Sequence, residues 1–331
     1  MAILTSEWPD VYGNLEVDWG EKMKSITRGN RQLCKVRNTK KKTGKATSRD
    51  NVGLAPDKDE GSPYAEESPQ QGYAITWEQS AVGTSYKLTH EMFLFEQTDD
   101  MSDVIGEMAE AVVMRQEHDI AMRLRYGNDT TFTNVSSKVT NIATADTKAL
   151  IADDHPIPNS ALTDDNDMDT LPFNRPNFIQ ARGRFRTFRN SKRLKVNGLD
   201  PKTIITSDDS DMEAAVDEVI FSKLDPESAR NRNNSLATKG YQHLMIPQLQ
   251  TDGSGLVDTT GAYYWFLADL KKTEMFLMVA EEEGMVMPKT IDMSDPNAPV
   301  TGDHITSTRG TYAIFTRRYH WIVGSYATSV G

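Results

Sequence analysis

The stretch SDVIGEMAEAVVMRQEHDIAMRLRYG, residues 102–127, is the most regular part of the sequence. Its apolar residues recur mostly every three or four positions, at Val104, Ile105, Met108, Ala111, Val112, Ile120 and Leu124. This spacing is typical of one face of an α-helix. Asp100 or Ser102 can cap its start, and Gly127 suits the position just after a helix end. About 25 residues at about 1.5 Å each span roughly 37 Å, so the stretch predicts a long spine helix.

Residues 21–97, before this helix, predict a long two-stranded excursion with a charged tip. Strand-forming residues occupy 32–37, 73–77 and 86–95, whereas residues 40–71 contain six Gly or Pro residues and few aliphatic ones. A structureless stretch of this length is uncommon inside a compact domain and is usually functional or disordered. The first 20 residues show little periodicity but contain Trp8 and Trp19. Tryptophan is common at interfaces, so this segment predicts an extended arm that lies on another surface.

The part of the chain after the spine helix predicts a mixed arrangement of helices and strands. A second helix begins at Asn174, with Pro176 in its first turn, and Ser210 to Glu213 form a capping box that opens a third helix. Strands are expected at 202–206, 241–249, 263–268, 274–280 and 311–319. The fold class predicted from this order is α+β.

Length and composition exclude several classes of protein. At about 150 residues per domain, the 331 residues predict roughly two compact bodies. No apolar run approaches the roughly 18 residues of a membrane-spanning helix, and the first residues do not resemble a secretory signal. The single cysteine, Cys34, cannot form an intrachain disulfide, which fits a reducing compartment.

The net charge of -11 hides blocks of a single sign. Residues 22–49 contain eleven basic residues and no acidic one, and residues 50–67 contain six acidic residues against Lys58. The pattern repeats, with seven aspartates in 146–169 and eight basic residues in 175–195. Such blocks usually form solvated or flexible segments. The alternatives are pairing between copies of the chain and contact with phosphates.

The sequence contains no recognisable catalytic or metal-binding motif. The six histidines lack metal-ligand spacing, Cys34 has no identifiable base, and the phosphate-binding and nucleophile-elbow glycine patterns are absent. We therefore expect no enzymatic activity, no catalytic residue, no cofactor and no metal. Histidines are expected on the surface or bonded locally.

A basic stripe in the second helix allows two interpretations. Arg182, Arg186, Arg189 and Arg193 share one spacing, and the nearby Phe185 and Phe188 share another. Stacking of these rings on nucleic-acid bases would need them beside the arginines. Packing of the rings in the core is favoured, and the arginines remain candidates for non-specific contact with a polyanion.

The order of parts resembles the major capsid protein of tailed bacteriophages, with the HK97-like fold, and is similar to Mu-like major head subunits. The stretches that carry the resemblance are Asp154-His155-Pro156, residues 177–186, 201–206 and 264–269, and the closing 319–325. It implies an N-terminal arm (1–20), an extended E-loop hairpin with flanking strands (21–97), a spine helix and peripheral domain (98–199), an axial domain (200–300) and a C-terminal return to the peripheral domain (301–331).

The resemblance also implies a function. Copies of such a protein would assemble, through hexamers and pentamers, into an icosahedral shell around phage double-stranded DNA. The protein would be located in the virion capsid, which would assemble in the host cytoplasm. A portal and scaffolding or decoration proteins would be further partners, and no membrane would be involved. The inter-subunit contact candidates are Trp8, Trp19, Lys40, Lys41, Lys42, Lys45, Arg49, Asp57, Asp59, Glu60, Glu66 and Glu67. The DNA-facing candidates are Arg182, Arg186, Arg189 and Arg193.

Two alternatives stay open. An encapsulin-like shell would have the same fold and package an enzyme in place of DNA. A nucleic-acid-binding protein would use the basic blocks 22–49 and 175–195, and its affinity for DNA would fall steeply with salt.

Overall fold

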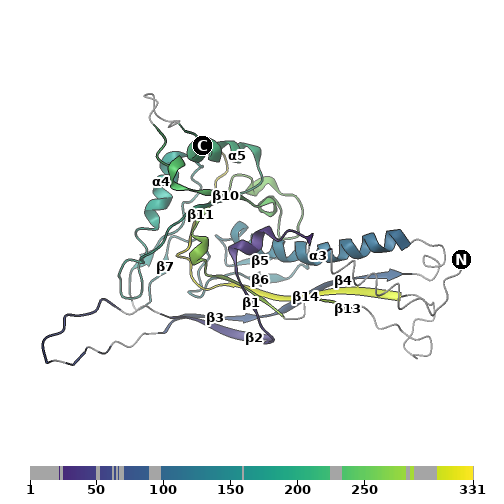
Figure 1. The fold of residues 1–331 in the computed structure, drawn as a ribbon, viewed down its shortest axis with the longest axis horizontal. Helices are drawn as coiled ribbons and strands as arrows, with labels where there is room; N and C mark the ends of the chain where they lie inside the picture. Colours follow the sequence, from purple (N-terminus) through teal and green to yellow (C-terminus); the bar gives the residue numbers. More distant parts are fainter. Residues whose placement is uncertain are drawn as a thin grey trace.

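The computed structural model describes residues 22, 25–49, 53–61, 63–64, 66, 71–88, 98–158, 160–223, 233–280, 284–286 and 304–330. These residues form an α+β fold with two main sheets, a long helix and a projecting hairpin (Figure 1). The predicted arm at 1–20, with Trp8 and Trp19, lies outside the described residues.

The first sheet, here called the long sheet, is organised around one strand of 13 residues. That strand pairs with one neighbour over residues 80–88 and, on its other side, with two shorter strands. A fifth strand completes the sheet by pairing parallel with one of these two shorter strands, β12 (Met275–Val279). The members are β1 (Lys35–Asn38), β4 (Ser80–Leu88), β12 (Met275–Val279), β13 (Gly284–Val286) and the central β14 (His304–Thr316).

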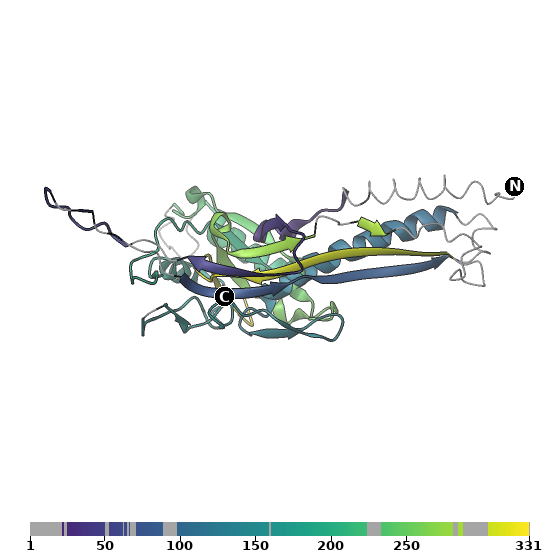
Figure 2. The same cartoon turned by 90° about the horizontal axis from the view of Figure 1, so that it is seen from below.

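The spine helix α3 (Thr98–Arg125) runs along the long sheet, as Figure 2 shows. Its Asp119 carboxylate accepts a hydrogen bond from the Tyr312 hydroxyl of β14 at 2.7 Å. The helix and strand approach closely at Gly310, where an added Cβ would come within 2.8 Å of Val112. Ile120 and Leu124 are fully buried. The helix predicted from the apolar spacing is confirmed, but it begins at Thr98, so Asp100 and Ser102 lie inside the helix and the predicted cap is wrong.

The second sheet, here called the buried sheet, is enclosed on both faces. It has the order β10 (Gln242–Met245), β9 (Thr203–Thr206), β11 (Trp265–Ala268) and β15 (Ile322–Ser325). Successive side chains of a strand point to opposite faces. In β11, Trp265 and Leu267 join the core on the side of α4 (Arg175–Arg184), whereas Phe266 joins the core that includes the end of α3.

Local capping explains where the two short helices on the buried sheet begin. The Asn174 side chain accepts a hydrogen bond from the Asn177 amide at 3.0 Å at the start of α4. The cap of α5 (Ser210–Val216) is the Asp209 side chain rather than the predicted Ser210, and α5 continues into a π-helical turn, η2 (Asp217–Phe221). The described part of the chain also contains five 3₁₀ helices: η1 (Gly29–Leu33), η3 (Ala237–Lys239), η4 (Pro247–Gln250), η5 (Thr259–Gly261) and η6 (Leu270–Lys272).

The predicted two-stranded excursion is present as β2 (Thr43–Arg49) and β3 (Gln71–Glu78), which pair antiparallel. The Trp77 ring lies against Gly44, where an added Cβ would come within 2.4 Å of it. Trp77 also stacks on Phe315 of β14, with ring centroids 6.2 Å apart, which joins the hairpin base to the long sheet. Beyond the strands, the segment projects away from both sheets (Figures 1 and 2).

Two small antiparallel hairpins lie outside the two main sheets: β5 (Thr131–Thr133) with β6 (Val139–Asn141), and β7 (His155–Pro156) with β8 (Thr163–Asp164). None of the described helices is long and apolar enough to cross a membrane.

The boundaries expected at 199/200 and 300/301 do not coincide with the division between the two sheets. β12, from the expected axial segment, pairs with β14 in the long sheet. Both α4 and β15, expected in the peripheral domain, pack on or within the buried sheet. Strand pairs between segments this far apart leave no local pattern in the sequence, so the two sheets do not follow the order of the chain.

Candidate assembly surfaces

The hairpin places lysines of the basic block 22–49 at one end and carboxylates of the acidic block 50–67 at the other, although the two blocks are adjacent in the sequence. Lys40, Lys41, Lys42 and Lys45 lie at its base, where the Lys42 ammonium pairs with the Glu78 carboxylate at 3.2 Å. The backbone of Arg49 ends β2. At the far end Asp57, Asp59, Glu60 and Glu66 are exposed, and Glu67 lies outside the described residues. We call residues 53–66 the acidic tip.

The acidic tip presents apolar groups as well as charge. Leu54 and Tyr64 are 77% and 79% exposed, and the Lys58 ammonium lies 4.4 Å from the centroid of the Tyr64 ring. No carboxylate of the tip forms an ion pair with any residue that the structure describes. A two-stranded ribbon buries too little surface to be stable alone, so a projecting ribbon of this kind is suited to lie on another surface.

The four arginines predicted to form one stripe are distributed over different structures. α4 ends at Arg184, and a turn follows in which the Arg186 amide donates to the Gly183 carbonyl. The backbone amide of Arg189 donates to the Asp164 carboxylate at 2.8 Å, and its guanidinium group, with the side chain 39% exposed, lies 4.0 Å from the same carboxylate. Arg193 lies in a turn with φ of 59°. The predicted stripe is therefore wrong, because the helix ends before three of its four members. The phenylalanines, Phe185 and Phe188, are buried in the core as predicted.

The structure instead gathers three cations, Arg182, Arg186 and Lys195, around a hollow of about 310 Å³. Lys239 is an exposed cation outside this lining, and burial together with the charges of Arg182 and Arg186 lowers its pKa. We call these four residues and the hollow the basic hollow. Lys239 is not among the predicted site residues, because it belongs to a different polar loop.

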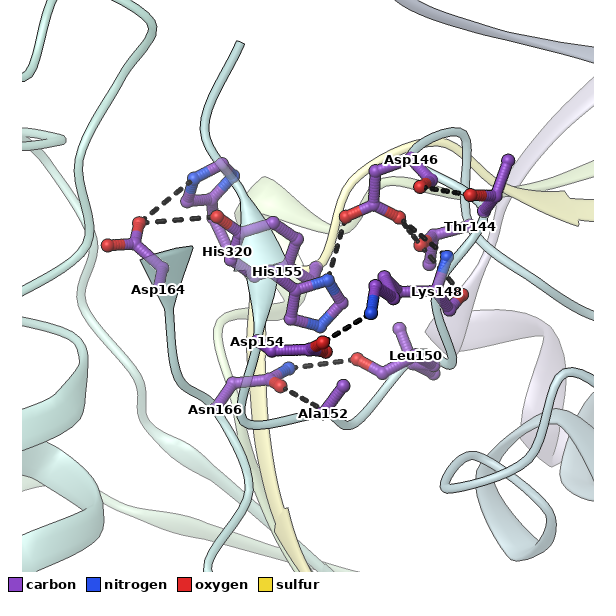
Figure 3. Close-up of polar contacts among 12 residues, drawn as sticks. Thr144, Asp146, Lys148, Leu150, Ala152, Asp154, His155, Asp164, Asn166 and His320 are labelled. Atoms are coloured by element: carbon purple, nitrogen blue, oxygen red, sulfur yellow. Dashed lines mark hydrogen bonds and ion pairs between the residues drawn. The ribbon is translucent and has the colours of Figure 1, made fainter. Parts of the chain in front are cut away.

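A buried polar network holds the loop after β6 against the end of the chain (Figure 3). The Asp146 carboxylate accepts from His155 Nδ1 at 2.8 Å and from the Thr144 hydroxyl. Burial raises the pKa of Asp146, but the hydrogen bond and charge of His155 outweigh it, and the pKa is below its usual value. His155 is fully buried and bonded locally, in keeping with the prediction for histidines. The acidic block 146–169 is therefore only partly solvated, because Asp146 and Asp164 are buried.

The second half of the network is a stack of rings. Tyr319 lies between His155 and His320, with ring centroids 3.7 Å and 4.2 Å away. The Tyr319 hydroxyl donates to Asp164 at 3.2 Å, and His320 Nε2 donates to the Arg189 carbonyl at 3.1 Å. The stack and its hydrogen bonds join residues 155–164, Arg189 and residues 319–320, which are distant in sequence, so its role is structural.

The network predicts a loss of stability in mild acid. Burial, with a smaller contribution from the Arg318 charge, lowers the pKa of His320 to about 3. The histidine of the unfolded chain takes up a proton near pH 6.5, so the free energy of unfolding falls as the pH drops below that value. At about 1.4 kcal/mol per pH unit, His320 should lower the free energy of unfolding by about 2 kcal/mol between pH 7 and pH 5. Urea unfolding of the wild type and of His320→Gln across this range measures the loss. If the free energy of unfolding of the two proteins depends on pH in the same way, the prediction is contradicted.

No cluster of three His, Cys, Asp or Glu side chains among the described residues could hold a metal ion. Cys34 is buried, and burial raises the pKa of its thiol to about 12, so it is not a thiolate at neutral pH.

The chain has the fold of phage capsid proteins. It superimposes on the capsid structure of the cyanophage P-SCSP1u with a TM-score of 0.55 and 9% identity, covering 90% of this chain and 87% of that one. For the mature capsid of bacteriophage PhiM1 the TM-score is 0.53 with 12% identity, over 92% and 89% of the two chains. For a chain of Gordonia phage Cozz it is 0.53 with 10% identity, over 92% and 91%. The amino-acid sequence matches no protein-family model and no curated protein.

Proposed function

We propose that this protein is a major capsid protein whose copies assemble into an icosahedral shell around phage double-stranded DNA. The observation that carries the proposal is the likeness in fold to phage capsids over about nine-tenths of both chains. The projecting hairpin supports it, because such a ribbon needs a neighbour to cover its surface. Contacts that repeat from one copy to the next close into rings, here hexamers and pentamers of an HK97-like shell.

The parts of the chain then take the following roles. The hairpin corresponds to the E-loop, and α3 with the long sheet to the spine and peripheral domain. The buried sheet with α4 and α5 corresponds to the axial domain, in place of the boundaries expected from chain order. Residues 1–20 would form the arm, with Trp8 and Trp19 on a neighbour. Assembly would take place in the host cytoplasm, with a portal, scaffolding or decoration proteins as partners.

Electron microscopy of the purified protein tests the proposal. We expect closed particles, or hexamers and pentamers, whose abundance increases with protein concentration. A chain that stays monomeric at every concentration, with residues 53–66 protected from proteolysis, would overturn the proposal. Particles that contain a packaged enzyme and no DNA would indicate the encapsulin-like alternative.

The structure does not favour the alternative of a nucleic-acid-binding protein that uses two continuous basic blocks. The arginines of 175–195 are divided between a short helix, a partly exposed position beside the Asp164 carboxylate and a turn. In the first block Lys42 pairs with Glu78 of its own hairpin.

A further inference from the structure

The lining of the basic hollow has three cations against a single carboxylate, that of Asp200. This carboxylate pairs with Lys202 at 3.1 Å. No carboxylate in the described part of the chain forms an ion pair with Arg182, Arg186, Lys195 or Lys239. Placing several uncompensated cations around one hollow costs electrostatic free energy, which a bound anionic group would recover.

The hollow also offers apolar contacts. Val196 and Leu199 line it while half-buried, and both pack against the core of the buried sheet. A ligand that fits the hollow therefore combines negative charge with an apolar side chain. Interfaces are commonly built in this way, with apolar contacts at the centre and charges at the rim.

The acidic tip has this composition. Asp57, Asp59 and Glu60 are exposed and unpaired within the described residues, and Leu54 and Tyr64 are the exposed apolar side chains beside them. In both views the tip projects away from the body that carries α4, so it is presented to another molecule (Figures 1 and 2).

We propose that the acidic tip of one copy of this chain docks on the basic hollow of a neighbouring copy. The inference rests on the proposed function, because it names the contact that links neighbouring subunits of the shell. DNA is the competing anion, but a duplex presents a long, evenly charged backbone, whereas Arg182, Arg186 and Lys195 line a local hollow that also has apolar residues.

Charge reversal tests the contact. One variant carries Arg186→Glu and Lys239→Glu, a second carries Asp57→Lys and Asp59→Lys, and a third combines all four changes. All four residues are exposed, so the fold should be retained, which circular dichroism checks. Sedimentation and electron microscopy measure the fraction of protein in particles. We expect each double reversal to reduce this fraction at least tenfold and the combined variant to recover at least half of it.

A matched control separates the contact from net charge. Lys138→Glu with Lys271→Glu changes the net charge by the same amount at two exposed lysines elsewhere and should assemble like the wild type. Normal assembly of the Arg186/Lys239 variant, or no recovery in the combined variant, would overturn the inference. If the Arg186/Lys239 variant forms particles normally but these contain less DNA than wild-type particles, the inference is also overturned, because the hollow would then face DNA. If the wild type itself does not assemble, the proposed function fails instead.

Discussion

A chain in which Asn-Gly replaces residues 50–70 should remain folded and lose the ability to form particles. Arg49 and Gln71 are cross-strand partners, so a two-residue turn can join β2 to β3 directly. The change removes the whole acidic tip, including the exposed Leu54 and Tyr64. Because the two buried cores contain none of the described residues of this segment (53–61, 63, 64 and 66), the free energy of unfolding should change by less than about 1 kcal/mol. Sedimentation velocity should show subunits or small oligomers only.

The control for this deletion keeps the length of the excursion. A variant with the order of residues 53–66 shuffled retains the reach and the net charge of the tip but not its pattern. Partial assembly of the shuffled chain and none of the shortened chain would separate reach from side-chain contacts. Particles of wild-type size from the shortened chain would show that the hairpin is dispensable and would remove a main support of the capsid proposal.

The elements predicted correctly are those whose signal is local. The spine helix has apolar residues at helical spacing over 25 positions and a glycine at its end, and these features act within a few residues. The hairpin is marked by Gly and Pro between two strand-forming stretches. Both are present in the structure.

The errors arise where distant segments meet. The length of α4 was overestimated because Arg186, Arg189 and Arg193 continue the helical spacing after the helix has ended. The turn at Gly183 and the buried Asp164, which binds the Arg189 amide, decide the path of the chain there. The four cations of the basic hollow likewise meet only in the folded chain, so their spacing in the sequence does not reveal them.

The buried network shows the same dependence on tertiary structure and leads to the second large expected effect. Asp146→Ala should destabilise the fold by about 3 kcal/mol, because it removes the acceptor of a buried pair. Its carboxylate accepts from His155 Nδ1 at 2.8 Å, from the Thr144 hydroxyl and from the Lys148 amide at 3.3 Å. Without it, a fully buried imidazole loses its hydrogen-bond partner, and such a group cannot reach water. Urea unfolding at pH 7 measures the loss.

The pH dependence of this loss has a defined sign. The pKa of Asp146 in the folded chain lies below its usual value, so its contribution is present above that usual pKa and disappears as the pH falls through the folded pKa. The difference between the wild type and Asp146→Ala should therefore be constant from pH 7 to pH 5 and shrink below pH 4. Asp154→Ala is the matched control, because Asp154 lies in the same loop but is half exposed and pairs only with Lys148 at the surface, so its effect should be far smaller. Equal effects of the two substitutions would show that burial of the Asp146–His155 pair does not stabilise the loop against the end of the chain.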